Sequence, residues 1–357
     1  VQVLKVGVDK QTKQDIWIED PNPKNIKDVG FVSLDVCAYN SALVSLGLIT
    51  EERFLASNSI ASLQKFYIGW ANRIYHPDVI TTEKHRELLL LSNGLREFVI
   101  PVDTVFLTLT VDTQKDGFWY MVTAFCPDEI AHIVSAGFID SFESISNMIG
   151  GVFSDINRNK RGVEAFCIDR QGIEERTAEV DAYCNSLAKE GVDFVYPMMG
   201  REKDRNNRAM WPIKIDPEKS DLSITAWGHN TSYAKFTIAN YLSRSVDNVV
   251  NKQNYTNRLI FINEDLVQIG LQNEKSGAES IEKQLTSEHF IHPVDKNGKI
   301  AKDGVWQPTY DGRPNHLLDC LVMAFNIATM RKVNLATRHD VIDYDKISQG
   351  IEQLYES

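Results

Sequence analysis

Apolar runs that end in an aspartate are the feature that most constrains how this chain can fold. Residues 102–112 alternate apolar and polar side chains with period two and close on Asp112. This period predicts a strand, with Asp112 on the same face as the threonines of the run. Residues 163–168 are nearly all apolar and close on Asp169. That pattern is typical of a central strand covered on both faces.

The surrounding pattern predicts an α/β domain with a mixed central sheet flanked by helices. Residues 117–126 and 130–139 form two further apolar runs, which we expect to make an antiparallel meander with the first strand. A helix over 174–190 and a strand over 192–196 complete a β-α-β unit around the Asp169 strand. Other expected elements are helices near 143–157, 233–244 and 314–332, and strands near 222–226, 258–262 and 290.

A third aspartate, Asp319, interrupts the apolar helix expected over 314–332, where Pro314 suits the first helical position. A carboxylate in apolar surroundings is costly unless it is paired, hydrogen-bonded or bound to a cation. Three such aspartates suggest a shared metal site. His316 precedes Asp319 by three residues, so both lie on one helix face. Its imidazole could orient a carboxylate, contact a phosphate or carry a proton, or simply cap the helix or face solvent.

Such a carboxylate set suits phosphodiester hydrolysis. The reaction needs a nucleophilic water, charge neutralisation on the phosphate and a stabilised leaving oxygen, and two divalent cations about 3.5–4 Å apart supply all three. Mg²⁺ prefers oxygen ligands and keeps several waters, so a few aspartates suffice. The pattern therefore predicts a metal-dependent nuclease. In the structural alternative, each aspartate is a buried hydrogen-bond acceptor that only stabilises the fold.

The net charge of −11 is unfavourable for binding nucleic acid, so we expect DNA contact to be confined to a local basic segment. Residues 158–161 carry three cations that we interpret as solvated surface. Residues 200–208 follow a core strand, and we expect their cations to contact DNA. These are Arg201, Lys203, Arg205 and Arg208.

Two function classes are disfavoured by composition. No apolar stretch approaches the roughly 20 residues that cross a bilayer. The five cysteines are an odd number without CxxC spacing, which argues against a zinc site or a disulfide framework. We expect them to be buried free thiols.

Three segments resemble the nuclease motifs of large terminase subunits from tailed bacteriophages, most closely the lambda-like branch. They are residues 109–116 (LTVDTQKD), 167–172 (CIDRQG) and 313–320 (RPNHLLDC). In that family a strand ends Asp-x-Gln-x-Asp, a second strand ends Asp-Ser-Gly, and a helix carries Asn-His/Glu-x-x-Asp-Cys. The resemblance covers roughly 101–333. Arg170 and Gln171 depart from it, since the family has serine and glycine after the second acid.

The resemblance implies a ribonuclease H-like endonuclease that cleaves concatemeric viral double-stranded DNA during genome packaging in the host cytoplasm. It implies partners as well: a portal protein, a small terminase subunit and a packaging ATPase domain, with no membrane. Two Mg²⁺ or Mn²⁺ ions are implied as cofactors. The implied residues are Asp112, Asp169 and Asp319 as metal ligands, His316 as their assistant, Asp116 on a turn, and Lys235 as the match to a family lysine near the DNA.

On this interpretation residues 1–100 are a mostly helical region that joins the ATPase, 101–333 the nuclease domain and 334–357 a polar tail. No Gly-x-x-x-x-Gly-Lys-Ser/Thr phosphate loop occurs, so we expect the motor half to be absent from this chain.

Two alternatives remain open at this point. One is another ribonuclease H-like nuclease, such as a resolvase or transposase core. Those usually show a strongly basic chain, a glutamate as the last acid or a separate helix-turn-helix, and none of these is obvious here. The other is a non-catalytic module that docks on DNA or on the portal. Metal-dependent nicking that a chelator abolishes separates an enzyme from a docking module.

Overall fold

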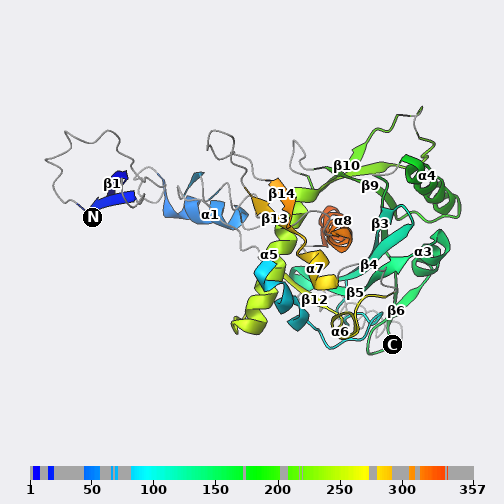
Figure 1. Ribbon diagram of the computed structural model, residues 1–357, viewed down its shortest axis with the longest axis horizontal. Helices are drawn as coiled ribbons and strands as arrows, with labels where there is room; N and C mark the ends of the chain where they lie inside the picture. Colours follow the sequence, from blue (N-terminus) through cyan, green and yellow to red (C-terminus); the bar gives the residue numbers. More distant parts are fainter. Residues whose placement is uncertain are drawn as a thin grey trace, which may run out of the picture. The chain divides into compact units, whose positions relative to one another are not determined.

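The computed structural model contains two compact units, Val1–His76 and Pro77–Ser357 (Figure 1). The structure describes residues 3–8, 15–19, 44–56, 66, 69–70, 82–171, 174–201, 208–216, 218, 220–272, 280–291, 305–309, 314–333 and 336.

In the smaller unit, strands β1 (Val3–Val8) and β2 (Asp15–Glu19) pair as an antiparallel hairpin that the sequence patterns did not suggest. Helix α1 (Leu46–Ala56) lies within the stretch where helical spacing was expected. The Arg53 guanidinium stands 6.0 Å from the centre of the Phe66 ring, which stacks in turn on Trp70. Most of residues 57–76 and the cysteine at position 37 lie outside the described residues.

The larger unit is built on an eight-stranded mixed sheet with the order β10-β11-β9-β8-β3-β4-β5-β12. Its meander consists of β3 (Phe106–Gln114), β4 (Gly117–Cys126) and β5 (Ile130–Ile139). Parallel strands β8 (Ala165–Asp169), β9 (Val195–Arg201) and β11 (Ala226–Asn230) extend it from β3. The edges are β10 (Met210–Ile213), antiparallel to β11, and β12 (Leu259–Ile262), parallel to β5. This order, with α4 (Glu174–Lys189) joining β8 to β9, confirms the predicted α/β fold with a mixed central sheet built from an antiparallel meander and a β-α-β unit.

Helices cover both faces of this sheet (Figure 1). One face packs on α5 (Thr231–Val250) and α8 (His316–Met330), and the side chains of Trp119, Met121 and Cys167 belong to this core. The opposite face packs on α3 (Phe142–Ile149) and α4, against Leu109 and Val111. Alternation along β3 therefore sends Leu107, Leu109 and Val111 toward α3 and α4. Thr108, Thr110 and Asp112 point toward α8.

Smaller elements complete the unit. They are the 3₁₀ turns η3 (Thr82–Leu90) and η4 (Pro127–Glu129), the hairpins β6 (Val152–Ser154) with β7 (Lys160–Gly162) and β13 (Glu288–Ile291) with β14 (Val305–Pro308), and the short helices α6 (Glu264–Gln268) and α7 (Ile281–Leu285). Leu88 and Leu91 are fully buried in the core of this unit. The expected domain boundary at residue 100 stays a prediction.

Several element boundaries differ from those expected. The helix expected over 143–157 ends at Ile149, because the pair Gly150-Gly151 stops it and the chain returns as β6. The strand expected at 222–226 is instead β11, which begins where that range ends. Helix α8 begins at His316, with Asn315 as N-cap, so Pro314 precedes the helix and does not occupy its first position.

The expectation about the cysteines is met within the described residues. Cys126, Cys167, Cys184 and Cys320 are buried free thiols. No helix of the described part of the chain is long and apolar enough to cross a membrane.

Candidate metal centre

Strand register brings Asp112 and Asp169 together. On the parallel neighbours β3 and β8, Val111 is paired with Ile168, so Asp112 and Asp169 follow side by side near the carboxyl ends of the two strands. Alternation aims both carboxylates at the face that α8 covers. The Thr113 hydroxyl donates to the Asp169 carbonyl oxygen at 2.5 Å, which ties the two strand ends together. The carboxyl edge of parallel strands is where α/β sheets commonly place a binding site.

Helix α8 brings Asp319 to the same place. Burial first, and then the Asp112 and Glu288 carboxylates, raise the pKa of Asp319 to about 7, although Lys235 opposes the shift. Burial and then Asp112 and Asp319 raise the pKa of Asp169 well above its usual value. Solvent still reaches 36% of the Asp319 side chain. Each carboxylate thus lies within the field of the others, and the protein alone does not neutralise their combined charge.

The His316 imidazole contacts Asp112. Its Nδ1 lies 2.8 Å from Asp112 Oδ2, and the Gln114 side-chain amide donates to the same oxygen at 2.7 Å. The His316 ring stacks on Trp119, with 5.7 Å between ring centres and 11° between planes. Trp119 is the β4 partner of Asp112. Of the roles considered for His316, this contact favours orienting a carboxylate. It also gives the glutamine of the Asp-x-Gln motif a function.

A fourth carboxylate, Glu288, lies beside Asp319, and sequence reasoning missed it. The Lys235 ammonium lies 2.8 and 2.7 Å from the two Glu288 oxygens and 3.8 Å from Asp319 Oδ1. The Asn315 side chain donates to Glu288 Oε1 at 2.9 Å. Lys235 is only 11% exposed, so its ammonium faces carboxylates here. Its expected contact with DNA stays a prediction.

Arg170 stands where the family motif has serine, and its side chain has a structural role of its own. Its guanidinium binds the Asp181 carboxylate on α4 through two hydrogen bonds of 2.8 and 2.7 Å, and both side chains are buried. Ser220 donates to the same carboxylate at 2.5 Å. The Arg170 side chain therefore anchors the end of β8 to α4. The backbone N–H of Gln171 donates to Asp169 Oδ1 at 3.0 Å.

Asp169 and Asp319 border an open cavity of about 320 Å³. Its lining residues come from the ends of β8, β9 and β11 and from α5 and α8. They are Asp169, Gln171, Gly200, Arg201, His229, Thr231, Asp319 and Met323. A side chain at position 200 would narrow the cavity, since an added Cβ would lie 3.2 Å from Thr231 Cγ2.

The residues around the cavity fit a hard divalent cation. Asp112, Asp169 and Asp319 offer only oxygen atoms, the ligands that Mg²⁺ prefers and Mn²⁺ readily accepts. A cation would also relieve the mutual repulsion that helps raise the pKa values of Asp169 and Asp319. Within the part of the chain that the structure describes, no three His, Cys, Asp or Glu side chains are already grouped closely enough to enclose an ion.

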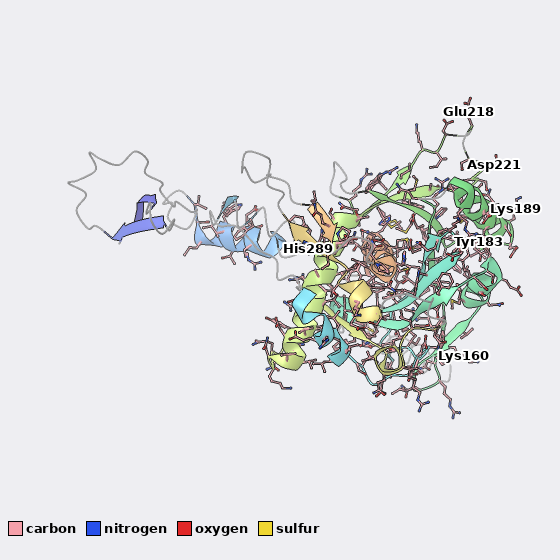
Figure 2. The ribbon with its side chains drawn as sticks, viewed as in Figure 1. Lys160, Tyr183, Lys189, Glu218, Asp221 and His289 are labelled. Atoms are coloured by element: carbon pink, nitrogen blue, oxygen red, sulfur yellow. The ribbon has the colours of Figure 1, made fainter. Side chains whose placement is uncertain are left out.

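The two basic segments lie at different ends of the sheet. Arg201 ends β9 and lines the cavity, and Arg208 is exposed shortly before β10, whereas positions 203 and 205 lie outside the described residues. The 158–161 segment belongs to the β6–β7 hairpin, where Arg161 donates to the Val105 carbonyl at 3.0 Å, beside the start of β3. Figure 2 shows Lys160 at the margin of the unit, well away from β10. Asp116 sits on the β3–β4 turn, as expected.

Residues 38–341 match the family described as "Terminase large subunit gpA, endonuclease domain". This chain belongs to that family. The match includes Asp112, Asp169, Asp319 and the whole sheet. It settles the choice between terminases and other ribonuclease H-like nucleases in favour of a phage DNA-packaging nuclease family.

Solved structures with some similarity are also terminase nuclease domains. The nuclease domain of the large terminase subunit gp2 of bacterial virus Sf6 is 12% identical, with a TM-score of 0.35, over 67% of this chain and 95% of that one. A point mutant of the same domain, with manganese and β-thujaplicinol, is 13% identical with a TM-score of 0.38 over the same shares. No match was found among curated proteins.

Proposed function

We propose that this chain is a metal-dependent endonuclease that cleaves concatemeric viral double-stranded DNA during genome packaging. The nuclease role in packaging is inferred from membership of the terminase family. The observation that supports metal dependence is that Asp112, Asp169 and Asp319 lie within one another's electrostatic field, with Asp169 and Asp319 on the cavity wall. Adjacent strand ends deliver two of these carboxylates, and an apolar helix delivers the third.

In this proposal the three aspartates hold two Mg²⁺ or Mn²⁺ ions. When bound, such ions supply the nucleophilic water, the charge neutralisation and the stabilised leaving oxygen that hydrolysis requires. His316 and Gln114 hold the Asp112 carboxylate in one orientation through their contacts to Oδ2. Arg170 fixes the end of β8 through Asp181. Lys235 lowers the pKa of Asp319 and so favours its charged form.

The DNA is expected to approach along the segment that follows β9. Arg201 already lines the cavity, and Lys203, Arg205 and Arg208 follow it before β10. Phosphate contacts of this kind position a duplex and read no bases, so cleavage should be indifferent to sequence. We further propose the portal protein, the small terminase subunit and the packaging ATPase domain as partners, with action in the host cytoplasm during virion assembly.

Plasmid nicking tests the proposal. The wild-type chain should nick supercoiled DNA with Mn²⁺, less well with Mg²⁺ because Mg²⁺ demands stricter octahedral geometry, and not at all with a chelator. Asp112→Asn, Asp169→Asn and Asp319→Asn should each abolish nicking. Asp193→Asn, at an exposed acid beyond the cavity, is the matched control and should nick normally.

Two results would contradict parts of the proposal. Nicking retained in any two of the three cavity variants would remove the shared site. A folded wild-type chain that binds duplex DNA but cuts it with neither ion would be a docking module, and the aspartates would then only stabilise the fold.

A further inference from the structure

His229 forms part of the cavity wall but has no place in the mechanism proposed above. It lies on β11 opposite Gly200 of β9, near the strand ends that carry the aspartates. Alternation puts it on the same face as Trp227, whose ring packs with the core beneath α8. His229 is only 5% exposed. A buried imidazole beside carboxylates calls for an account of where its proton sits.

Asn326 on α8 fixes that proton. This residue is fully buried, and its side-chain nitrogen lies 3.2 Å from the Asn230 carbonyl oxygen and 3.2 Å from His229 Nδ1. A carbonyl oxygen can only accept a hydrogen bond, so the amide of Asn326 must present its nitrogen to it. The same nitrogen then donates to His229 Nδ1, which must carry a lone pair. The ring proton of a neutral His229 is therefore on Nε2.

The ring is also uncharged. Burial, with a smaller contribution from the Lys235 ammonium, lowers the pKa of His229 to about 3. Its Nε2 lies beside Gly200, since a Cβ added there would be 3.7 Å from that atom, and both residues line the cavity. Glycine at position 200 thus leaves the Nε2–H open to the cavity. No described residue accepts a hydrogen bond from it.

A neutral N–H donor on this wall suits one class of ligand. Asp169 and Asp319 bring negative charge, and Arg201 brings positive charge from the end of β9. A phosphodiester oxygen that enters the cavity is a pure acceptor, and a neutral donor can bind it without forming an ion pair with the aspartates. We propose that His229 Nε2–H binds a non-bridging phosphate oxygen of the DNA strand, with Asn326 as a positioning residue. This contact rests on the proposed nuclease function.

The tautomer of His229 can be tested without measuring any enzyme activity. Nitrogen NMR of the wild-type chain, with ¹⁵N-labelled histidine rings, distinguishes a protonated Nε2 from a protonated Nδ1. The signal that disappears in His229→Gln assigns the residue. We expect the Nε2–H form at neutral pH. A ring protonated on Nδ1, or on both nitrogens, would overturn the proposal.

Two substitutions at His229 then distinguish the loss of the Nε2–H hydrogen-bond donor from a loss of packing. In His229→Asn the short amide can still meet Asn326 but no longer reaches the cavity, whereas the longer amide of His229→Gln can place a donor where Nε2 was. Losing one hydrogen bond to a charged group should weaken duplex binding, measured by fluorescence anisotropy in EDTA, by roughly tenfold or more. His229→Gln should stay within about threefold of wild type. In Mn²⁺, KM should follow the same order while kcat changes less.

His132 provides the matched control. It is a partly buried histidine whose Nδ1 likewise meets an asparagine amide, that of Asn93 at 2.9 Å, but it lies on β5 and does not line the cavity. His132→Asn should bind the duplex as the wild type does. Unchanged affinity in His229→Asn, or equal losses in His229→Asn and His229→Gln with normal melting, would overturn the contact. If the wild type binds DNA but never cuts it, only the proposed nuclease function is refuted. The affinity comparison would still decide the role of His229.

Discussion

Removing the Arg170 guanidinium should destabilise the larger unit strongly, because it leaves Asp181 buried without its charged partner. Arg170 and Asp181 are 5% and 3% exposed, so solvent cannot replace the lost contact. Arg170→Ser introduces the residue that the terminase motif usually has at this position. Breaking a buried ion pair from one side costs about 3–5 kcal/mol. At about 2 °C per kcal/mol for a unit of this size, the melting temperature should fall by roughly 6–10 °C.

The assay is a double-mutant cycle by urea unfolding and thermal melting. Replacing both partners with apolar residues, as in Arg170→Met with Asp181→Leu, removes the charge that has no partner and should restore most of the lost stability. Because Arg170 anchors the end of β8, Arg170→Ser should also lose part of the thermal stabilisation that Mn²⁺ gives the wild type. The reasoning is refuted if Arg170→Ser melts within about 2 °C of wild type, or if the double variant is less stable than the single one.

Three further predictions concern pH, salt and ATP. The folded pKa of Asp319, about 7, lies above its ordinary value of 3.8, so the folded chain holds a proton that the unfolded chain releases. Metal-free stability should therefore fall as pH rises from about 4 to 7, and melting curves of Asp319→Asn should lack this part of the slope. Replacing Arg201, Lys203, Arg205 and Arg208 with alanine should flatten the salt dependence of DNA binding by up to ~0.9 per lost contact. The same change at Arg158, Lys160 and Arg161 should not, and equal slopes for both sets would place the DNA path elsewhere. The chain should release no phosphate from ATP above a no-protein control, since it carries no phosphate loop.

The sequence predicted the centre of the sheet best. The strands over 117–126 and 130–139 have the expected bounds in β4 and β5, because long apolar runs between turns leave few alternatives. The same logic placed Asp112 and Asp169 at strand ends. Their adjacency could be inferred only by assuming that the two strands are parallel neighbours. The register Val111 with Ile168 supplies that adjacency in the structure.

Residues that act through long-range contacts were harder to predict. Glu288 lies on a four-residue strand with no detectable period, and only the fold brings it to Lys235, 53 residues away. His229 was missed because the strand expected at 222–226 lies four residues later, so position 229 fell outside the expected strand. Arg170 was noticed as a departure from a motif, but the burial of its partner Asp181 on α4 has no local signal.

The place of α8 in the chain has a consequence for synthesis. The contact between Asp112 and His316 spans 204 residues, and α8 supplies a large share of the apolar core on its face of the sheet. At about 5–20 residues per second, a ribosome needs roughly 10–40 s to travel from the first of these residues to the second. During that interval the nascent chain has Asp112 but neither the α8 part of the core nor Asp319. An unfinished chain should therefore be unable to cut DNA, so the order of the sequence itself delays the activity until the larger unit is nearly complete.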